Sequence, residues 1–209
     1  MKRLIAGLLL LVAATSAEAQ VTSANARFSV GIAVDRLFTL DGDANDAWGV
    51  GPVFRIGPDR GGWGPAFGLA WFETNLPASV GGVTGDFAQL KVRPVMGGIS
   101  YTIRRGPWSY DIGVAAGWTF NSAELLPAAE RYFESVDAGP VDVEVSNSFA
   151  ARPRLRVYYD TSTRVALMGA AGVLFVDPEV TLRSGAQSIT FNRNLTSFTL
   201  EAGIVFALF

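Results

Sequence analysis

The sequence predicts an all-β protein, an eight-stranded antiparallel up-and-down transmembrane β-barrel. The clearest observation is the strict alternation of residues 108–120, which read W-S-Y-D-I-G-V-A-A-G-W-T-F. Every second residue there is aromatic or aliphatic, with aromatic residues at both ends, as in a strand that ends at the two surfaces of a membrane. The segment also exceeds the roughly 9 to 11 residues that a tilted strand needs to cross the hydrocarbon. Comparable segments recur along the chain, separated by gaps that are alternately long and short.

The first half of the chain supplies four predicted strands, in residues 27–35, 48–57, 65–71 and 89–103. In the second of them Pro52 removes a backbone donor, so we expect an edge or a bulge there. In the fourth, the apolar set that begins at Leu90 is expected to face lipid, which turns Lys91 and Arg93 inward. The apolar phase changes at residues 97–98, where we expect a β-bulge.

The second half supplies four more predicted strands, in residues 108–120, 149–159, 165–176 and 198–208. The second of these carries Arg152, Arg154 and Arg156 on one face. The third is rich in Gly and Ala and apolar throughout, and its pattern does not assign its two faces. An even number of strands places both chain termini on the same side of the membrane.

The gaps between the predicted strands fall into two classes. The long ones are 40–46, 73–86, 121–140 and 177–195, and the short ones are 57–62, 104–107 and 160–163. Brief turns at one rim and extended loops at the other are typical of a membrane barrel. Residues 126–133, within the third long gap, are expected to form a short helix. The tryptophans then divide between the rims, with Trp63 and Trp108 at the turn end and Trp48, Trp71 and Trp118 at the loop end.

Residues 1–19 are interpreted as a secretory signal peptide, because Lys2 and Arg3 precede an apolar run that closes in small residues. The run is shorter than the ~20 residues of a membrane-spanning helix. We therefore expect one mature barrel domain in residues 20–209. The chain has no cysteine, which excludes a disulfide framework. Its 19 acidic residues outnumber its 17 basic ones, which argues against nucleic-acid binding.

A secreted soluble barrel would alternate in the same way, so the second face of the strands decides between the two. A face in contact with water should be rich in Lys, Glu and Thr. Here the second face is mostly Gly, Ala and Ser with occasional charges. Small residues suit the crowded interior of a narrow barrel of about eight strands. The composition therefore favours a barrel whose apolar face meets lipid.

The leader, the eight alternating strands, the unequal loops and the terminal Phe209 together resemble the small outer-membrane β-barrel family of Gram-negative bacteria. That group contains outer-membrane proteins X and W and the membrane domain of outer-membrane protein A. The resemblance implies a location in the bacterial outer membrane, with its lipids and lipopolysaccharide as surroundings. It also implies that Phe209 is an assembly signal, read by the barrel-assembly machinery.

The faces predicted to point inward carry an excess of positive charge. The predicted interior network is Arg27, Asp35, Arg55, Lys91, Arg93, Asp111, Arg152, Arg154, Arg156 and Glu201. An unpaired ion in a dry interior costs several kcal/mol, so these groups must pair with each other or meet water. One interpretation is a closed salt-bridge plug, with Asp111 paired to Arg154 or Arg156. The other is a narrow anion-preferring pore, because rings of Arg and Lys select anions.

The long gaps are acidic, which suggests where an outward-facing function lies. Their carboxylates are Asp41, Asp43, Asp46, Glu73, Asp86, Glu124, Glu130, Glu134, Asp137, Asp142, Glu144, Asp177 and Glu179. We expect a structural or surface-interaction role through these outer loops, with a surface ligand as a possible partner. The alternative is a narrow channel for anions or other small solutes.

Enzyme activity is not expected. The chain has no histidine, so a general base near neutral pH would have to be a strongly perturbed carboxylate or lysine. It has no G-x-S-x-G elbow for a nucleophilic serine. Asp41, Asp43 and Asn45 match the start of a calcium loop, but Asp46 and Pro52 stand where Gly and Glu are needed. The sequence therefore predicts no metal site and no cofactor.

Overall fold

The computed structural model describes residues 28–56, 61–80, 83–135, 139–184 and 187–208. Nine strands form one antiparallel sheet that closes on itself through the pairing of β5 with β6. Two consecutive strands, β3 and β4, both pair with β5 and occupy one place in the ring. The ring therefore has eight positions, which confirms the predicted barrel. The predicted signal peptide, Arg27 and Phe209 lie outside the described residues.

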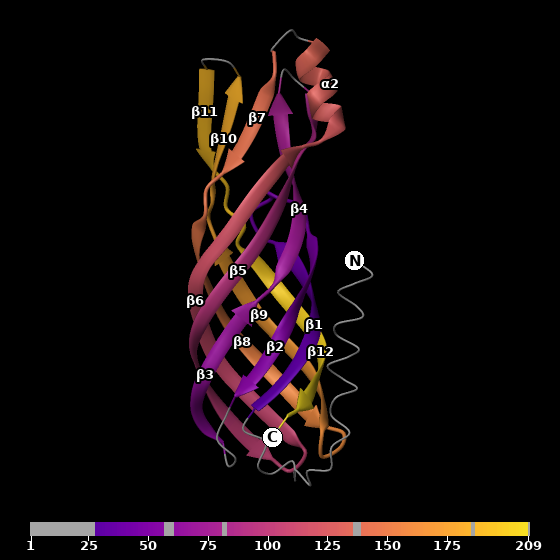
Figure 1. Cartoon of the computed structure of the whole chain (residues 1–209), viewed down its shortest axis with the longest axis vertical. Helices are drawn as coiled ribbons and strands as arrows, with labels where there is room; N and C mark the ends of the chain where they lie inside the picture. Colours follow the sequence, from indigo (N-terminus) through magenta and orange to yellow (C-terminus); the bar gives the residue numbers. More distant parts are fainter. Residues whose placement is uncertain (1–27, 57–60, 81–82, 136–138, 185–186, 209) are drawn as a thin grey trace.

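The ring follows the order of the chain, as an up-and-down barrel requires (Figure 1). Its strands are β1 (Phe28–Thr39), β2 (Ala47–Ile56), β3 (Gly62–Leu69), β4 (Trp71–Val80), β5 (Val83–Arg105), β6 (Trp108–Leu125), β8 (Ser148–Asp160), β9 (Val165–Val176) and β12 (Ser197–Ala207). The first and last strands pair in register from Ser29↔Ala207 to Thr39↔Ser197. This pairing closes the ring between its first and last strands. It places the start of β1 and the end of β12 at the same rim of the barrel.

The long connections gather at the opposite rim, the loop end, where they build a second layer of structure (Figure 1). A three-stranded antiparallel sheet there has the order β11-β10-β7, with α2 near it. The bounds are α2 (Pro127–Ser135), β7 (Val141–Val145), β10 (Glu179–Ser184) and β11 (Gln187–Asn192). The helix confirms the prediction for residues 126–133. Among the described residues, no helix is both long and apolar enough to cross a membrane.

The connections at the other rim, the turn end, are short. The tightest joins β5 to β6, where Arg105 pairs with Trp108 and only two residues lie between them. Gly106 has φ 59°, which a side chain would strain, and Pro107 follows it. The short gaps therefore turn the chain at one rim, as the sequence predicts.

The outer surface of the barrel is an apolar belt bordered by aromatic residues. Val114 and Ile112 are exposed in its middle. At the turn end the ring centroids of Trp108 and Tyr159 are 4.7 Å apart, and at the loop end those of Trp118 and Phe149 are 6.2 Å apart. All five tryptophans are exposed. Apolar side chains between two aromatic girdles form the surface that a transmembrane barrel presents to lipid.

The structure contradicts two of the predictions, one of the long loops and the β-bulge. Residues 73–86, predicted as a loop, continue β4 and begin β5, and the two strands pair as far as Val80↔Val83. The register of β5 with β6 runs without interruption from Ala88↔Leu125 to Arg105↔Trp108, so the bulge expected at residues 97–98 is not there. A register shift lies instead at Leu76/Pro77.

The predicted facing of β5 near the loop end is also wrong. Val92 is 0% exposed and points inward, whereas Arg93 is exposed on the outer surface and Lys91 shares its face. The prediction assumed that apolar residues face lipid and polar residues face the interior. Here the interior is itself apolar, so both faces of β5 carry hydrophobic side chains and the pattern assigns the wrong one.

A charge in the middle of the belt should destabilise the barrel. We expect Val114→Arg to lower the free energy of unfolding by about 2–4 kcal/mol, because an arginine at the bilayer midplane loses its hydration. Ile189→Arg is the control, since Ile189 is 67% exposed on the outer sheet and should change stability by no more than about 0.5 kcal/mol. Urea unfolding in lipid vesicles measures both. Equal effects would contradict the placement of the belt.

Candidate functional site

The interior of the barrel is divided along its axis into an apolar zone and a charged zone. The apolar zone fills the loop half and reaches into the outer sheet and helix. Its largest members from the barrel are Leu37, Phe72, Leu76, Phe87, Leu90, Val92, Met96, Leu174 and Val176, and Val143, Val180 and Ala129 continue it outward. The environment inside the barrel therefore changes halfway along the axis, from apolar on the loop side to charged on the turn side.

Arg152 forms the boundary between the two zones. Its Nη2 lies 2.8 Å from Oδ1 of Asp35, and its Nη1 lies 2.7 Å from Oε1 of Glu201. The two carboxylates are directly opposite each other on β1 and β12. All three side chains are only 5% exposed. A guanidinium that contacts two carboxylates at once compensates the like-charge repulsion between them and ties three strands together inside the barrel.

Arg154 and Arg156 extend this row toward the turn end. Nη2 of Arg154 donates to the carbonyl oxygen of Phe67 at 2.5 Å, and Nη2 of Arg156 lies 3.5 Å from the same oxygen. Nε of Arg156 is 3.8 Å from Oε2 of Glu201. Arg154 has no carboxylate within ion-pair distance in the described part of the chain. Side chains from β8 therefore reach across the interior to the backbone of β3.

Asp111 does not make the ion pair that the sequence suggested. Its Oδ2 accepts hydrogen bonds from Ser100 Oγ at 2.7 Å and Thr102 Oγ1 at 3.0 Å. Arg156 is its neighbour across the β6–β8 pair, but the arginine turns toward Glu201. Hydroxyl donors on the adjacent strand satisfy the carboxylate, so Arg154 and Arg156 find their partners elsewhere.

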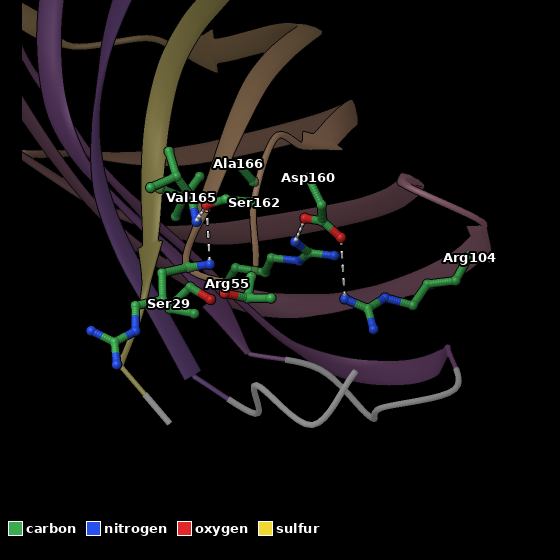
Figure 2. Close-up of a pocket in the computed structure, with 11 residues that line it drawn as sticks. Ser29, Arg55, Arg104, Asp160, Ser162, Val165 and Ala166 are labelled. Carbon is green, nitrogen blue, oxygen red and sulfur yellow. Dashed lines mark hydrogen bonds and ion pairs between the residues drawn. The ribbon is translucent and has the colours of Figure 1, made fainter. Parts of the chain in front are cut away.

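A second charged cluster lies at the turn end (Figure 2). Asp160, at the end of β8, lies 3.3 Å from Nη1 of Arg55 and 3.8 Å from Nη2 of Arg104. Arg55 also donates to Ser109 Oγ at 2.7 Å, and its guanidinium lies 4.5 Å from the ring centre of buried Tyr158. The cavity beside this cluster has a volume of about 20 Å³. That is room for about one water molecule, and too little for a larger solute.

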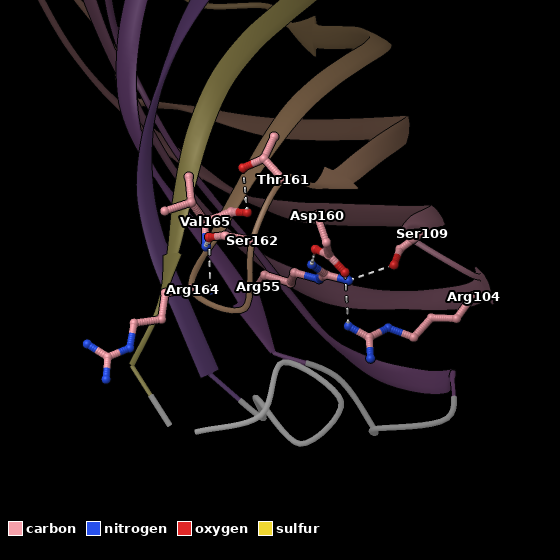
Figure 3. Close-up of polar contacts among 8 residues, drawn as sticks. All are labelled: Arg55, Arg104, Ser109, Asp160, Thr161, Ser162, Arg164 and Val165. Atoms are coloured by element: carbon pink, nitrogen blue, oxygen red, sulfur yellow. Dashed lines mark hydrogen bonds and ion pairs between the residues drawn. The ribbon is translucent and has the colours of Figure 1, made fainter. Parts of the chain in front are cut away.

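The turn between β8 and β9 is fixed by its own hydroxyl groups (Figure 3). Ser162 Oγ accepts from the backbone N–H groups of Arg164 at 3.3 Å and Val165 at 3.1 Å, and Thr161 Oγ1 donates to the carbonyl of Val165 at 3.0 Å. Such local bonds stabilise a tight turn. The turn end of the barrel is therefore bordered by an ordered turn and an ion-pair cluster.

The predicted charge network is thus only partly present. Of the residues proposed for the interior, Asp35, Arg55, Asp111, Arg152, Arg154, Arg156 and Glu201 lie there. Lys91 and Arg93 lie outside the wall, for the reason given above. Sequence reasoning missed Arg104 and Asp160, because both fell in segments interpreted as turns. Their position at the ends of strands with an inward phase was the signal that could have found them.

The connections at the loop end contact one another. Nη1 of Arg193 is 3.4 Å from Oδ1 of Asp43, and its Nη2 donates to the carbonyl of Pro77 at 3.3 Å. Asn194 donates through its side chain to Asp41 and through its backbone to Asp43. The loop carboxylates are therefore used in part to hold the loops together. Among the described residues, no group of three or more His, Asp or Glu could hold a metal ion.

The wall has a weak seam between β2 and β3. The ladder between β2 and β4 covers only Trp48 to Val50, and no further pairing of β2 on that side occurs among the described residues. The two segments still approach closely, since a side chain at Gly51 would collide with the backbone of Leu69. Pro52 and Pro65 lie on the facing segments and lack the N–H that a ladder needs. The expectation of an edge at Pro52 is thus met at this seam.

A groove opens in the outer wall directly above the seam. It has a volume of about 460 Å³ and is lined by Trp48, Gly49, Val50, Trp71, Phe72, Glu73, Lys91, Val92 and Arg93. Phe72 and Val92 also belong to the apolar interior. Phe72 is paired with Gly49 on β2 and with Val92 on β5, so the groove and the apolar zone meet across these paired strands.

Comparison with known proteins agrees with this architecture. The outer membrane protein OprG from Pseudomonas aeruginosa is similar in structure, with a TM-score of 0.72 over 86% of this chain and 94% of that chain, at 14% sequence identity. The chain has the fold of the small outer-membrane β-barrels. Neisserial surface protein A is also similar, with a TM-score of 0.52, 13% identity, and coverage of 87% of this chain and 97% of that one. No protein-family model and no curated sequence matches the chain.

The buried ion pairs of Arg152 should contribute to the stability of the barrel. We expect Arg152→Met to lower the free energy of unfolding by about 3–5 kcal/mol, because it leaves Asp35 and Glu201 buried without a cation. Adding Asp35→Asn and Glu201→Gln should recover part of the loss. Arg183→Met is the control, since its pair with Glu144 is exposed and worth about 1 kcal/mol or less. Urea unfolding in vesicles measures these differences. An equal loss of stability in Arg152→Met and Arg183→Met would contradict a stabilising role for the ion pairs of Arg152.

Proposed function

We propose that this outer-membrane barrel is a passive conduit for small apolar molecules. They enter the apolar zone from the loop end and leave sideways through the wall, into the outer leaflet of the membrane. The observation that carries this proposal is the meeting of three features at one level: the end of the apolar zone, the unpaired seam and the groove.

The chemistry of the interior favours an apolar solute. A molecule without charge gains by contact with Phe72, Leu90 and Val92, and it gains nothing by descending to the arginine row. Below the row, Arg55 and Arg104 are paired with Asp160, and the cavity beside them has room for about one water. An apolar molecule would have to pass these charges to continue along the axis, whereas the seam between β2 and β3 offers a way sideways into hydrocarbon.

The seam supplies the place where the wall can part at low cost. Opening an intact ladder would expose several backbone donors and acceptors to lipid, each at a cost of several kcal/mol. Pro52 and Pro65 have no donor to expose, and the carbonyl of Phe67 already accepts from Arg154. Separation of β2 from β3 therefore breaks fewer hydrogen bonds than separation of any regularly paired strands.

An anion-preferring pore is less well supported by the same contacts. Arg152 is held by two carboxylates, and Arg55 and Arg104 share a third. These pairs cancel much of the positive charge that would attract an anion. Catalysis is not part of the proposed function either, since the chain has no histidine and its buried carboxylates are held in ion pairs or hydroxyl hydrogen bonds.

A second candidate function is contact with an external surface or ligand through the outer loops. The observation that favours it is the outer sheet, where β11 forms an edge of the sheet and Ile189 is 67% exposed. An exposed edge without charged residues is a place where another chain can pair. A surface role alone predicts no dependence of solute uptake on the seam, so the following experiment separates the two candidates.

A disulfide across the seam should stop uptake. Phe54 and Phe67 face each other there, with ring centroids 6.4 Å apart, and the chain has no native cysteine. In Gram-negative cells that express the Phe54→Cys/Phe67→Cys variant, we expect oxidation to lower the uptake of N-phenyl-1-naphthylamine to the rate of cells without the barrel. Reduction should restore it, because only the seam has been locked.

The matched control is a lock across an intact ladder. Ile112 and Leu155 are directly opposite on β6 and β8 and face outward like the first pair. Oxidation of the Ile112→Cys/Leu155→Cys variant should leave uptake unchanged. Equal uptake by the oxidised and reduced seam variants, with the disulfide verified by mass spectrometry, would refute the lateral path.

A further inference from the structure

Two basic residues lie on the outer wall of the barrel, where a charged side chain is unfavourable. Lys91 and Arg93 lie on the outward face of β5 and line the groove above the seam. Charged side chains on the lipid face are unfavourable at depth and tolerated near the interface. Trp48 and Trp71, which line the same groove, mark the girdle at the loop end. The two cations therefore lie at the level of the lipid head groups.

Arg93 is not used inside the protein. Its side chain makes no hydrogen bond or ion pair with another side chain in the described part of the chain, and the residue is exposed. Its neighbour across the β5–β6 pair is Phe120, an exposed aromatic residue that offers no charge. A guanidinium at a membrane interface with no protein partner is free to form a bidentate contact with a phosphate.

The rest of the groove supplies a second cation and an apolar border for a lipid phosphate. Lys91 is directly opposite Glu73 across the β4–β5 pair, so Arg93 carries the positive charge that no carboxylate of the groove compensates. Lys91 Nζ donates to Glu124 at 2.8 Å, but Glu124 is 67% exposed, so this pair is weakly held. Trp48, Val50 and Trp71 add an apolar border against which a sugar or the first carbons of an acyl chain can pack.

We propose that this groove binds the phosphate of an anionic glycolipid of the outer leaflet, of the lipid A type. Arg93 contacts the phosphate directly, Lys91 contributes the second positive charge, and the two tryptophans contact the sugar backbone. The phosphate lies at the charged side of the groove, away from the seam, where the proposed exit for apolar molecules begins. The lipid site does not depend on the proposed conduit.

Native mass spectrometry of the folded barrel in uncharged micelles tests the site. Bisphosphorylated lipid A should bind with a Kd about tenfold or more below that of the same lipid after removal of its phosphates, as expected for one hydrogen bond between charged groups. Arg93→Gln should abolish most of this difference, and Lys91→Gln should reduce it. Arg183→Gln, an exposed arginine on the outer sheet, is the matched control and should bind like the unaltered barrel.

Each result has a definite meaning. Equal binding of phosphorylated and dephosphorylated lipid by the unaltered barrel would overturn the site, whether or not the variants fold. Equal weakening by Arg93→Gln and Arg183→Gln would also overturn it, because it would indicate attraction to overall charge. Complete competition by inorganic phosphate at the lipid's concentration would rule out a lipid as the occupant. The uptake assay with the seam disulfide remains an independent measurement of the conduit.

Discussion

The bridge of Arg152 to Asp35 and Glu201 is the constraint around which the interior is arranged. Two carboxylates on adjacent strands repel each other, and burying either without a cation would cost several kcal/mol. A single guanidinium between them removes that cost and fixes β8 relative to β1 and β12. Charge is thereby confined to the turn half, and the loop half is left to apolar side chains.

This division gives a physical meaning to the irregularity of the wall. A closed ring in lipid must satisfy its backbone internally, and most of this ring does so through long antiparallel ladders. The seam between β2 and β3 departs from that rule at two prolines, and Arg154 supplies the carbonyl of Phe67 with a donor from across the interior. The arginine row therefore places paired charges across the interior and also contacts the backbone at the seam. The groove lies directly above the seam.

The sequence predicted the barrel well because alternation, loop lengths and aromatic girdles are all local in sequence. It predicted the arginine row for the same reason, since Arg152, Arg154 and Arg156 share one face of one strand. It failed for Lys91 and Arg93, because an interior that changes from apolar to charged along its axis is a property of all strands together. The partners of the arginines were also out of reach, since they lie on strands far apart in the chain, and short outer strands such as β11 are hidden among polar loop residues.

Conductance of the refolded barrel in a planar bilayer tests the central claim most directly, which is that paired charges close the axis. The ion pairs of Arg152 with Asp35 and Glu201, and of Asp160 with Arg55 and Arg104, predict a protein that inserts and passes no measurable current in either salt gradient. Insertion can be verified by the heat-dependent mobility of the recovered protein. Discrete current steps with anion preference would contradict the closed axis and would make the arginine row the lining of an open pore.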